Sequence, residues 1–260
     1  MNETGDRPQA VAAPSLPRIL KALLRTDFKV QLRNGRALIL NFVVPIALLY
    51  GLFVNKRASQ LGSVNFRVAI VLMVGMLTLA ILVYSITIAR DRERGVFQRL
   101  RATPAPSWTI MVSRLTVEVL AILILAVVVL IAARILENIS LSPEAYALTL
   151  VVVLLSSATF LSIGQALVGL VKSADTVNAV APLTYLPVLA LGLFGHSTVF
   201  GETFETVARW SPGGVVASLL AGAMQPSSWS SDTWWALLAS LAYTVVFAGI
   251  GIRWFRWTTT

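Results

Sequence analysis

Two carboxylates, Asp91 and Glu93, lie in the most highly charged segment of the chain, residues 90–108, which separates two strongly apolar runs. They cannot form a catalytic site on their own, because no nucleophile, base and orienting group are assembled there. Five arginines in the same segment could instead pair with acids on another protein, which predicts a docking element. The alternative is that the arginines only set the membrane orientation.

Local signals divide this segment further. Residues 96–102 are predicted to form a short helix, which Pro104 and Pro106 would end. Orientation alone would not require an acid, a glycine and a Thr-Pro pair in this order. We therefore favour docking over a purely topological role.

Composition places these charges in a membrane protein. Of 260 residues, 57% are hydrophobic and 13% charged, with a mean hydropathy of +0.78, which is too apolar for a soluble domain. The net charge of +9 does not predict a nucleic-acid partner, since the cations lie beside apolar runs. The chain has no cysteine, one histidine and no P-loop motif. This disfavours a metal-dependent enzyme and nucleotide binding by this chain.

Six stretches are long enough, or nearly so, to cross a bilayer as helices, which takes about 20 apolar residues. They are 37–54, 68–89, 115–133, 145–171, 177–195 and 234–252. With the N-terminus in the cytoplasm, 16 of the 21 lysines and arginines fall on the cytoplasmic side. The positive-inside rule therefore predicts a multi-pass protein of the plasma or inner membrane with both termini in the cytoplasm.

The N-terminal region is predicted to have two parts. Residues 1–15 are expected to form a disordered tail, and residues 16–36 a basic amphipathic helix at the cytoplasmic interface. Its apolar residues at helical spacing are Ile19, Leu20, Leu23, Leu24 and Phe28. A membrane anchor and a contact with a soluble partner remain alternatives. Residues 37–260 would form the six-helix transmembrane domain.

The segment 196–233 is predicted to contain a re-entrant element on the outer face. Two apolar pieces, 204–208 and 215–224, are too short to cross the bilayer and flank a Pro-Gly break. A loop lying on the surface is the alternative. The residues of the predicted element are Trp210, Pro212, Gly213 and Gly214.

One acid lies within a predicted span. Glu118 could relay protons or cations, but Arg114 precedes it by four residues. An intrahelical ion pair is the simpler explanation, and we favour it.

An acidic-Arg-Gly run followed by Leu-Arg and Thr-Pro, after the second of six spans, resembles the cytoplasmic coupling region of ABC-2 type transporter permeases. The amphipathic N-terminal helix is similar to that family's connecting helix, and Arg209-Trp-Ser-Pro-Gly-Gly to its exofacial element. The closest resemblance is to daunorubicin-resistance-type drug or lipid exporters. This chain has Val-Phe-Gln after Gly95, where Thr-Leu-Glu is common in the family.

The resemblance implies an all-α fold in which two permease subunits form the pathway and two separate ATPase subunits bind ATP and Mg²⁺. This chain would bind no cofactor itself. The residues implied to couple the permease to the ATPase are Asp91, Glu93, Arg94, Gly95, Arg99, Leu100, Thr103 and Pro104.

The substrate pathway is implied to run beside spans two and five, which brings forward Tyr84, Ser85, Asn178, Thr184 and Tyr185. Hydrogen bonding between helices of one subunit is the alternative for each of them.

The function implied is export of a hydrophobic or amphipathic compound, such as a drug, lipid or lipid-linked glycan, by alternating access. The second permease could be a copy of this chain or a relative. A stand-alone secondary transporter is the alternative class, although no inverted repeat or pair of buried acids supports it. An intramembrane enzyme is opposed by the lack of a convergent nucleophile or metal-ligand set.

Overall fold

The computed structural model describes residues 15–33, 35–54, 62–103, 106–195 and 200–255, and these residues form helices without a strand. The predicted tail, most of which lies in residues 1–14, and Pro104 lie outside the described residues. The long helices are α1 (Leu16–Arg33), α2 (Gly35–Val54), α3 (Val64–Leu77), α6 (Ser107–Glu137), α7 (Pro143–Leu170), α8 (Ala174–Phe194), α10 (Pro212–Met224) and α11 (Ser231–Trp254). The shorter elements are η2 (Thr78–Tyr84), α4 (Ser85–Glu93), α5 (Val96–Arg101), α9 (Glu202–Trp210) and η4 (Pro226–Ser228).

Five helices are long and apolar enough to cross a membrane. They are α6, α7, α8, α11 and the continuous helix Val64–Glu93, which consists of α3, the π-helical segment η2 and α4. These correspond to five of the six predicted spans. The first predicted span corresponds to α2, whose described apolar part, Asn41–Val54, is shorter than a span, so the sixth crossing stays a prediction.

The helices extend further than the apolar runs predicted. Span three was expected at 115–133, but α6 runs from Ser107 to Glu137. Pro106 at the N-cap provides an abrupt start. Polar residues continue the helix at both ends because a helical backbone bonds to itself whatever its side chains are.

The Val64–Glu93 helix forms the centre of the bundle. Its segments contact α2, α6, α7, α8 and α10, and most of its side chains are fully buried, including Met73, Leu77 and Ile81. By contrast, α8 and α11 have outward-facing apolar side chains, such as Leu183 and Val245. Apolar faces of this kind fit lipid or a second membrane subunit.

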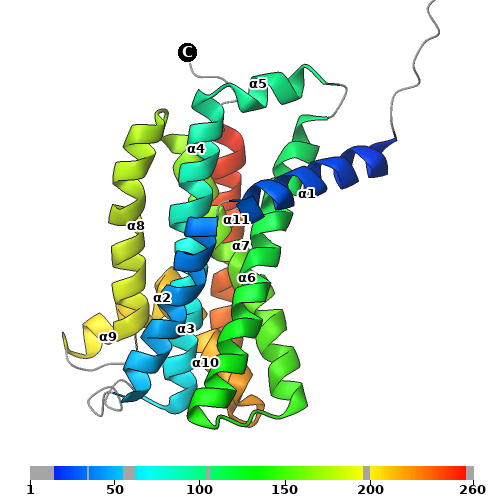
Figure 1. The fold of residues 1–260 in the computed structure, drawn as a ribbon. Helices are drawn as coiled ribbons and strands as arrows, with labels where there is room; N and C mark the ends of the chain where they lie inside the picture. Colours follow the sequence, from blue (N-terminus) through cyan, green and yellow to red (C-terminus); the bar gives the residue numbers. More distant parts are fainter. Residues whose placement is uncertain (1–14, 34, 55–61, 104–105, 196–199, 256–260) are drawn as a thin grey trace, which may run out of the picture.

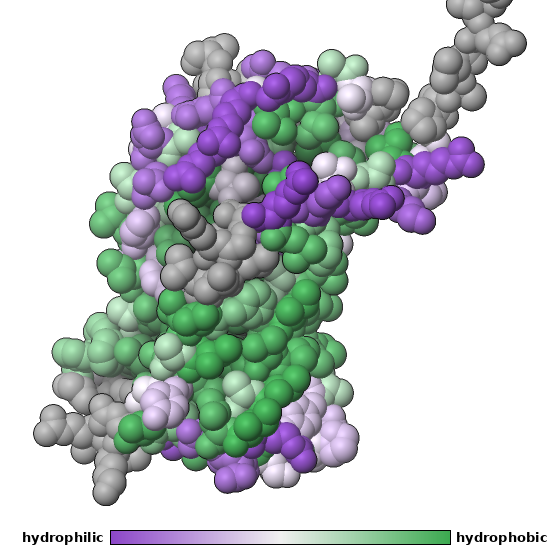
Figure 2. All heavy atoms as spheres, in the orientation of Figure 1, coloured by the Kyte–Doolittle hydropathy of each residue, from purple (hydrophilic) through white to green (hydrophobic). Residues whose placement is uncertain are grey.

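The two ends of the bundle are polar and its middle is apolar. Figure 1 shows α1, α5 and the end of α11 at one end, and α9 at the other. In Figure 2 a hydrophobic band separates hydrophilic side chains at these two ends. The start of α1 and the end of α11 therefore lie on the same side of the band, while the compartment they face stays a prediction.

The segment predicted to be re-entrant contains two helices, α9 and α10, joined at Ser211. The Ser211 hydroxyl caps α10 by accepting a hydrogen bond from the Gly214 amide at 3.1 Å. Most of α10 is buried, against α3, α7, α8 and α11. This burial differs from a loop lying on the surface, and the depth of the element in a bilayer stays a prediction.

A glycine on α7 allows a close helix contact with η2. A Cβ at Gly164 would collide with the backbone carbonyl oxygen of Ala80 in η2. We expect Gly164→Ala to destabilise the protein by about 1 to 3 kcal/mol, because a backbone neighbour cannot move aside as a flexible side chain can. The matched control is Gly249→Ala in α11, where a Cβ meets nothing within 4 Å and helix propensity favours alanine by about 1 kcal/mol. Thermal unfolding in detergent measures both, and equal effects of the two substitutions would contradict the expected close packing.

Candidate functional site

Three consecutive residues at the end of α4 connect it to different parts of the bundle. The first, Asp91, forms an ion pair with Arg114 of α6, with 2.8 Å between Oδ2 and Nη2. Both side chains are largely buried, with 17% and 15% exposed. The carboxylate predicted to face an ATPase is therefore paired within this chain.

The second residue, Arg92, is only 2% exposed and binds the C-terminal end of α7. Its guanidinium donates to the carbonyl oxygens of Val168 at 2.9 Å, Val171 at 2.7 Å and Lys172 at 2.8 Å. The last carbonyls of a helix have no partner within the helix, and a cation is favoured at that end of the helix dipole. Arg92 therefore caps α7 and fixes the short connection to α8.

The third residue, Glu93, binds the start of α8. Its Oε1 accepts a hydrogen bond from the backbone amide of Ala174 at 2.5 Å. The first amides of a helix have no intrahelical acceptor, and a carboxylate there interacts favourably with the helix dipole. Arg92 and Glu93 together hold the two ends of the connection between α7 and α8.

A glycine in the left-handed backbone conformation turns the chain from α4 into α5. Gly95 has φ of 68°, a conformation that costs a residue with a Cβ roughly 1–2 kcal/mol. This turn lets Phe97 of α5 reach the bundle, where it is fully buried and meets the ring of Phe255 edge-on, with centroids 6.1 Å apart. The glycine in the predicted motif therefore has a backbone role.

The outer side of α5 and the turn before it are basic and exposed. Arg94 and Arg99 are exposed, and the Arg99 guanidinium donates to the carbonyl oxygen of Arg94 at 3.0 Å. Leu100 packs partly against the core, and the Thr103 hydroxyl donates to the Leu100 carbonyl at 2.5 Å. Thus the predicted coupling residues divide into two acids that bind other helices of the chain, the largely buried Asp91 and the exposed Glu93, and an outward basic group.

The N-terminal helix α1 is also joined to Arg114, the partner of Asp91. Asp27 of α1 is 3.3 Å from Nε of Arg114 and accepts a hydrogen bond from the Ser113 hydroxyl at 2.6 Å. Arg114 therefore bridges carboxylates from α1 and α4.

The predicted ion pair between Arg114 and Glu118 is wrong. Arg114 is paired with Asp27 and Asp91, which approach it from two other helices. Glu118 is 5% exposed and accepts from the side-chain amide of Gln31 of α1 at 3.5 Å. Local spacing identified the right cation but could not show which acids tertiary packing brings to it.

Asp27 and Gln31 were not predicted as site residues. They continue the inward face of α1 at helical spacing from Leu20, Leu23 and Leu24. Phe28, on the predicted apolar face of this interfacial helix, is 40% exposed within the chain. The sequence signal that could have identified them is the presence of an acid and an amide on the apolar stripe of an interfacial helix.

The predicted pathway residues on span two are buried inside the subunit. Tyr84 is 1% exposed, and its hydroxyl donates to Oε1 of Gln165 on α7 at 2.5 Å. The buried Ser85 hydroxyl donates to the carbonyl oxygen of Ile81. The Tyr84 bond matches the alternative interpretation, hydrogen bonding between helices of one subunit, whereas the Ser85 bond lies within its own helix.

The predicted residues on α8 are spread along its length. Asn178 is exposed and lines a cavity of about 180 Å³ beside the coupling segment, together with Glu93 and Arg94. Further along, the Thr184 hydroxyl donates to the Val180 carbonyl at 3.1 Å. The Tyr185 and Thr78 hydroxyls lie 3.4 Å apart. The structure brings Asn178 to the coupling residues and leaves the other two near mid-helix.

The predicted exofacial residues lie where α9 meets α10. The carbonyl oxygen of Trp210 accepts a hydrogen bond from the Tyr243 hydroxyl of α11 at 2.8 Å. A Cβ at Gly213 would meet the backbone of α8, and one at Gly214 the backbone of α9. Pro212 is in the first turn of α10, where a proline is favoured. These residues therefore allow a tight three-helix junction.

The described residues combine five helices long and apolar enough to cross a membrane with a basic N-terminal helix, α1, and the short helix α5 between the Val64–Glu93 helix and α6. The sequence of residues 18–224 matches the family described as ABC-2 type transporter. The chain belongs to this family and is a multi-pass membrane protein of the transport permease class.

One relative illustrates this membership. The chain is similar to the protein named "Putative transport permease YvfS" of Bacillus subtilis (strain 168), with 25% identity over 227 residues. The alignment covers 85% of this chain and 90% of the relative.

Proposed function

We propose that this chain is the permease subunit of an ATP-driven exporter that moves a hydrophobic or amphipathic compound out of the cytoplasm. ATP and Mg²⁺ are bound by a separate ATPase subunit, present in two copies, and a second permease completes the pathway. The end of the bundle that carries α1 and α5 faces the cytoplasm. Family membership supports this assignment.

The observation that carries the proposal is the set of contacts made by residues 91–93. Asp91 contacts α6, Arg92 contacts the end of α7, and Glu93 contacts the start of α8. Through Arg114 the same segment reaches α1. A displacement of α5 by an ATPase would move the adjoining end of α4. Through these contacts it would also move α1, α6, α7 and α8, as ATP-driven alternating access requires.

The outer face of α5 supplies the contact itself. Arg99 on α5 and Arg94 in the turn before it are exposed, so an acidic patch on the ATPase is the complementary surface. The outward apolar side chains of α8, including Leu183 and Leu186, support a membrane-embedded interface with the second permease. Thr184 and Tyr185 lie on this helix and remain our candidates for the pathway.

Charge reversal on α5 tests the proposal. We expect Arg99→Glu to weaken capture of the partner ATPase by about tenfold, since a like charge placed against an acidic patch costs more than the lost attraction. Thermal unfolding is expected to stay unchanged, because Arg99 is exposed. Co-purification of the ATPase with tagged permease, and ATPase stimulation in nanodiscs, measure the effect.

The matched control is Arg134→Glu, an exposed arginine near the opposite end of α6. It changes the charge by the same amount and is expected to leave ATPase capture intact. Equal capture by both variants would remove α5 from the interface. Full transport by the purified chain without ATP or ATPase would establish the alternative class, a stand-alone secondary transporter.

A further inference from the structure

A polar pocket of about 280 Å³ lies at the end of the bundle opposite α5. It is formed by the start of α3, the end of α9, one side of α10, the turn η4 and the start of α11. Its volume is close to the lower limit for small-molecule sites. A single headgroup fits such a space better than a whole amphiphile does.

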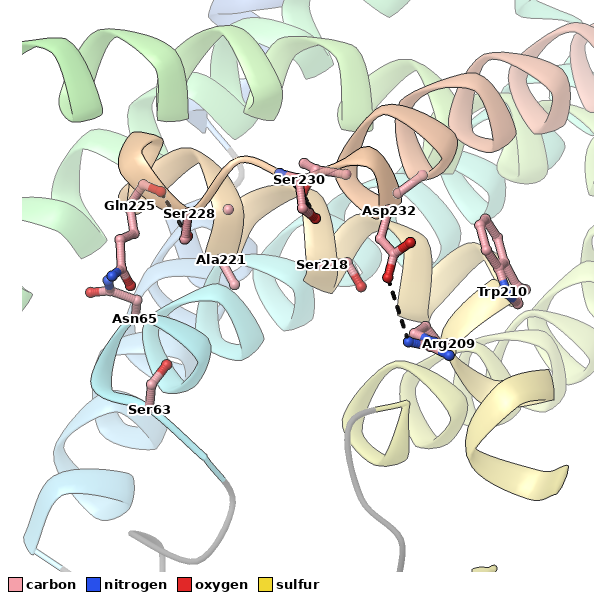
Figure 3. A pocket seen from close by; sticks show the side chains of 13 residues that line it. Ser63, Asn65, Arg209, Trp210, Ser218, Ala221, Gln225, Ser228, Ser230 and Asp232 are labelled. Atoms are coloured by element: carbon pink, nitrogen blue, oxygen red, sulfur yellow. Dashed lines mark hydrogen bonds and ion pairs between the residues drawn. The ribbon is translucent and has the colours of Figure 1, made fainter. Parts of the chain in front are cut away.

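The lining is rich in groups that both donate and accept hydrogen bonds. They are Asn65, Ser218, Gln225, Ser228, Ser230 and Thr233. Figure 3 shows the amide ends of Asn65 and Gln225 at one end of the pocket. Within the part of the chain that the structure describes, neither side-chain amide makes a hydrogen bond, so both are available to a ligand.

The lining of the pocket contains one cation and one anion, Arg209 and Asp232, so it has no net charge. At the other end in Figure 3, Arg209 and Asp232 form a loose ion pair with 3.9 Å between nitrogen and oxygen. An anionic headgroup would be repelled by Asp232, and a cationic one by Arg209. A zwitterion would have to separate the pair. A neutral group rich in hydroxyls is repelled by neither side chain and leaves the ion pair in place.

An indole ring borders the same end of the pocket. Trp210 is 39% exposed and lies beside Arg209 in Figure 3. Its broad apolar face can pack against the C–H face of a sugar ring, while neighbouring amides and hydroxyls bond the ring hydroxyls. Apolar contact on one side and two-way hydrogen bonding on the other is the chemistry of a polyhydroxylated ligand.

We propose that this pocket binds the neutral, polyhydroxylated headgroup of a glycosylated amphiphile on the outer side of the membrane. The inference rests on the proposed function and specifies its substrate class. The headgroup is held at the outer end of the pathway while its apolar part remains in the lipid.

The test is a binding measurement on the purified full chain without an ATPase. The chain is placed in phosphatidylcholine nanodiscs containing increasing fractions of monoglucosyl diacylglycerol, and bound lipid is counted by native mass spectrometry. We expect saturable binding of the glucosyl lipid, and much weaker binding of phosphatidylethanolamine or phosphatidylglycerol. Competition by free maltose distinguishes a soluble sugar from a membrane-anchored headgroup as the ligand.

Two variants assign the binding to the pocket. Gln225→Leu, at an exposed position, and Asn65→Ala are each expected to weaken binding of the glucosyl lipid by about three- to tenfold, the effect of one lost hydrogen bond. The control is Thr206→Val on α9, an exposed hydroxyl residue that does not line the pocket. Its affinity should equal that of the unmodified chain.

The inference is overturned if the charged or zwitterionic lipids bind as well as the glucosyl lipid, or if both pocket variants bind it unchanged. Because ATPase capture is measured in a separate experiment, either result counts against the headgroup alone. If the unmodified chain does not capture the ATPase, that result would instead count against the proposed function.

Discussion

Arg92→Ala is expected to destabilise the protein by about 3 to 5 kcal/mol and to abolish ATPase stimulation. The substitution leaves the carbonyl oxygens of Val168, Val171 and Lys172 without the guanidinium that binds them. Buried acceptors that lose a charged donor cost more than an average hydrogen bond contributes. The expected loss is large because Arg92 caps a helix end and holds the following connection at the same time.

Thermal unfolding in detergent and ATPase stimulation in nanodiscs measure this effect. Arg92→Lys keeps the charge but cannot present the planar fork that reaches three acceptors, so an intermediate loss is expected. The control is Arg90→Ala, which removes an exposed arginine two residues away and is expected to change stability by no more than about 0.5 kcal/mol. If Arg90→Ala and Arg92→Ala had equal effects, the capping role of Arg92 would be wrong.

Arg114→Ala is expected to cost about 3 kcal/mol. Asp27 and Asp91, whose side chains are 11% and 17% exposed, would keep their negative charges without a cation, and removing one partner of a buried pair is strongly destabilising. The two carboxylates would also repel each other, which should detach α1 from α6. Thermal unfolding and limited proteolysis near the N-terminus measure the two consequences.

Neutralising the acids provides the matched control. In the variant Arg114→Ala with Asp27→Asn and Asp91→Asn, no uncompensated charge remains, and we expect more than half of the lost stability to return. A triple variant as unstable as Arg114→Ala alone would show that Arg114 acts through packing of its aliphatic stem rather than through charge.

The sequence predicts the helical content and most spans well because apolar runs and charge placement are local properties. Residues 96–102 were expected to be helical, and α5 covers Val96–Arg101. The amphipathic pattern of residues 16–33 agrees with α1. In both cases helical spacing and proline breaks were sufficient, since neither depends on distant residues.

The partners of charged side chains could not be predicted in the same way. Arg92 resembled its exposed neighbours in the sequence, yet it is buried, while Arg94 and Arg99 are exposed. Its carbonyl acceptors are more than 70 residues away along the chain. Likewise, Glu118 was the nearest acid to Arg114 on its own helix, but α1 and α4 supply the acids that bind it. Such partners depend on how helices meet, which single-sequence periodicity does not encode.

The contacts of Arg92 and Glu93 also decide where α8 can bend. The connection from α7 to α8 spans only residues 171–173, and both of its ends are bound to α4. These bonds couple this end of α8 to α4, so a movement of α4 would be expected to carry the start of α8 with it. Pro182 and Pro187 lie further along α8, where a missing amide donor weakens the helix. A swing of α8 relative to α7 would thus pivot at these prolines, and its amplitude would grow toward Gly195 and α9.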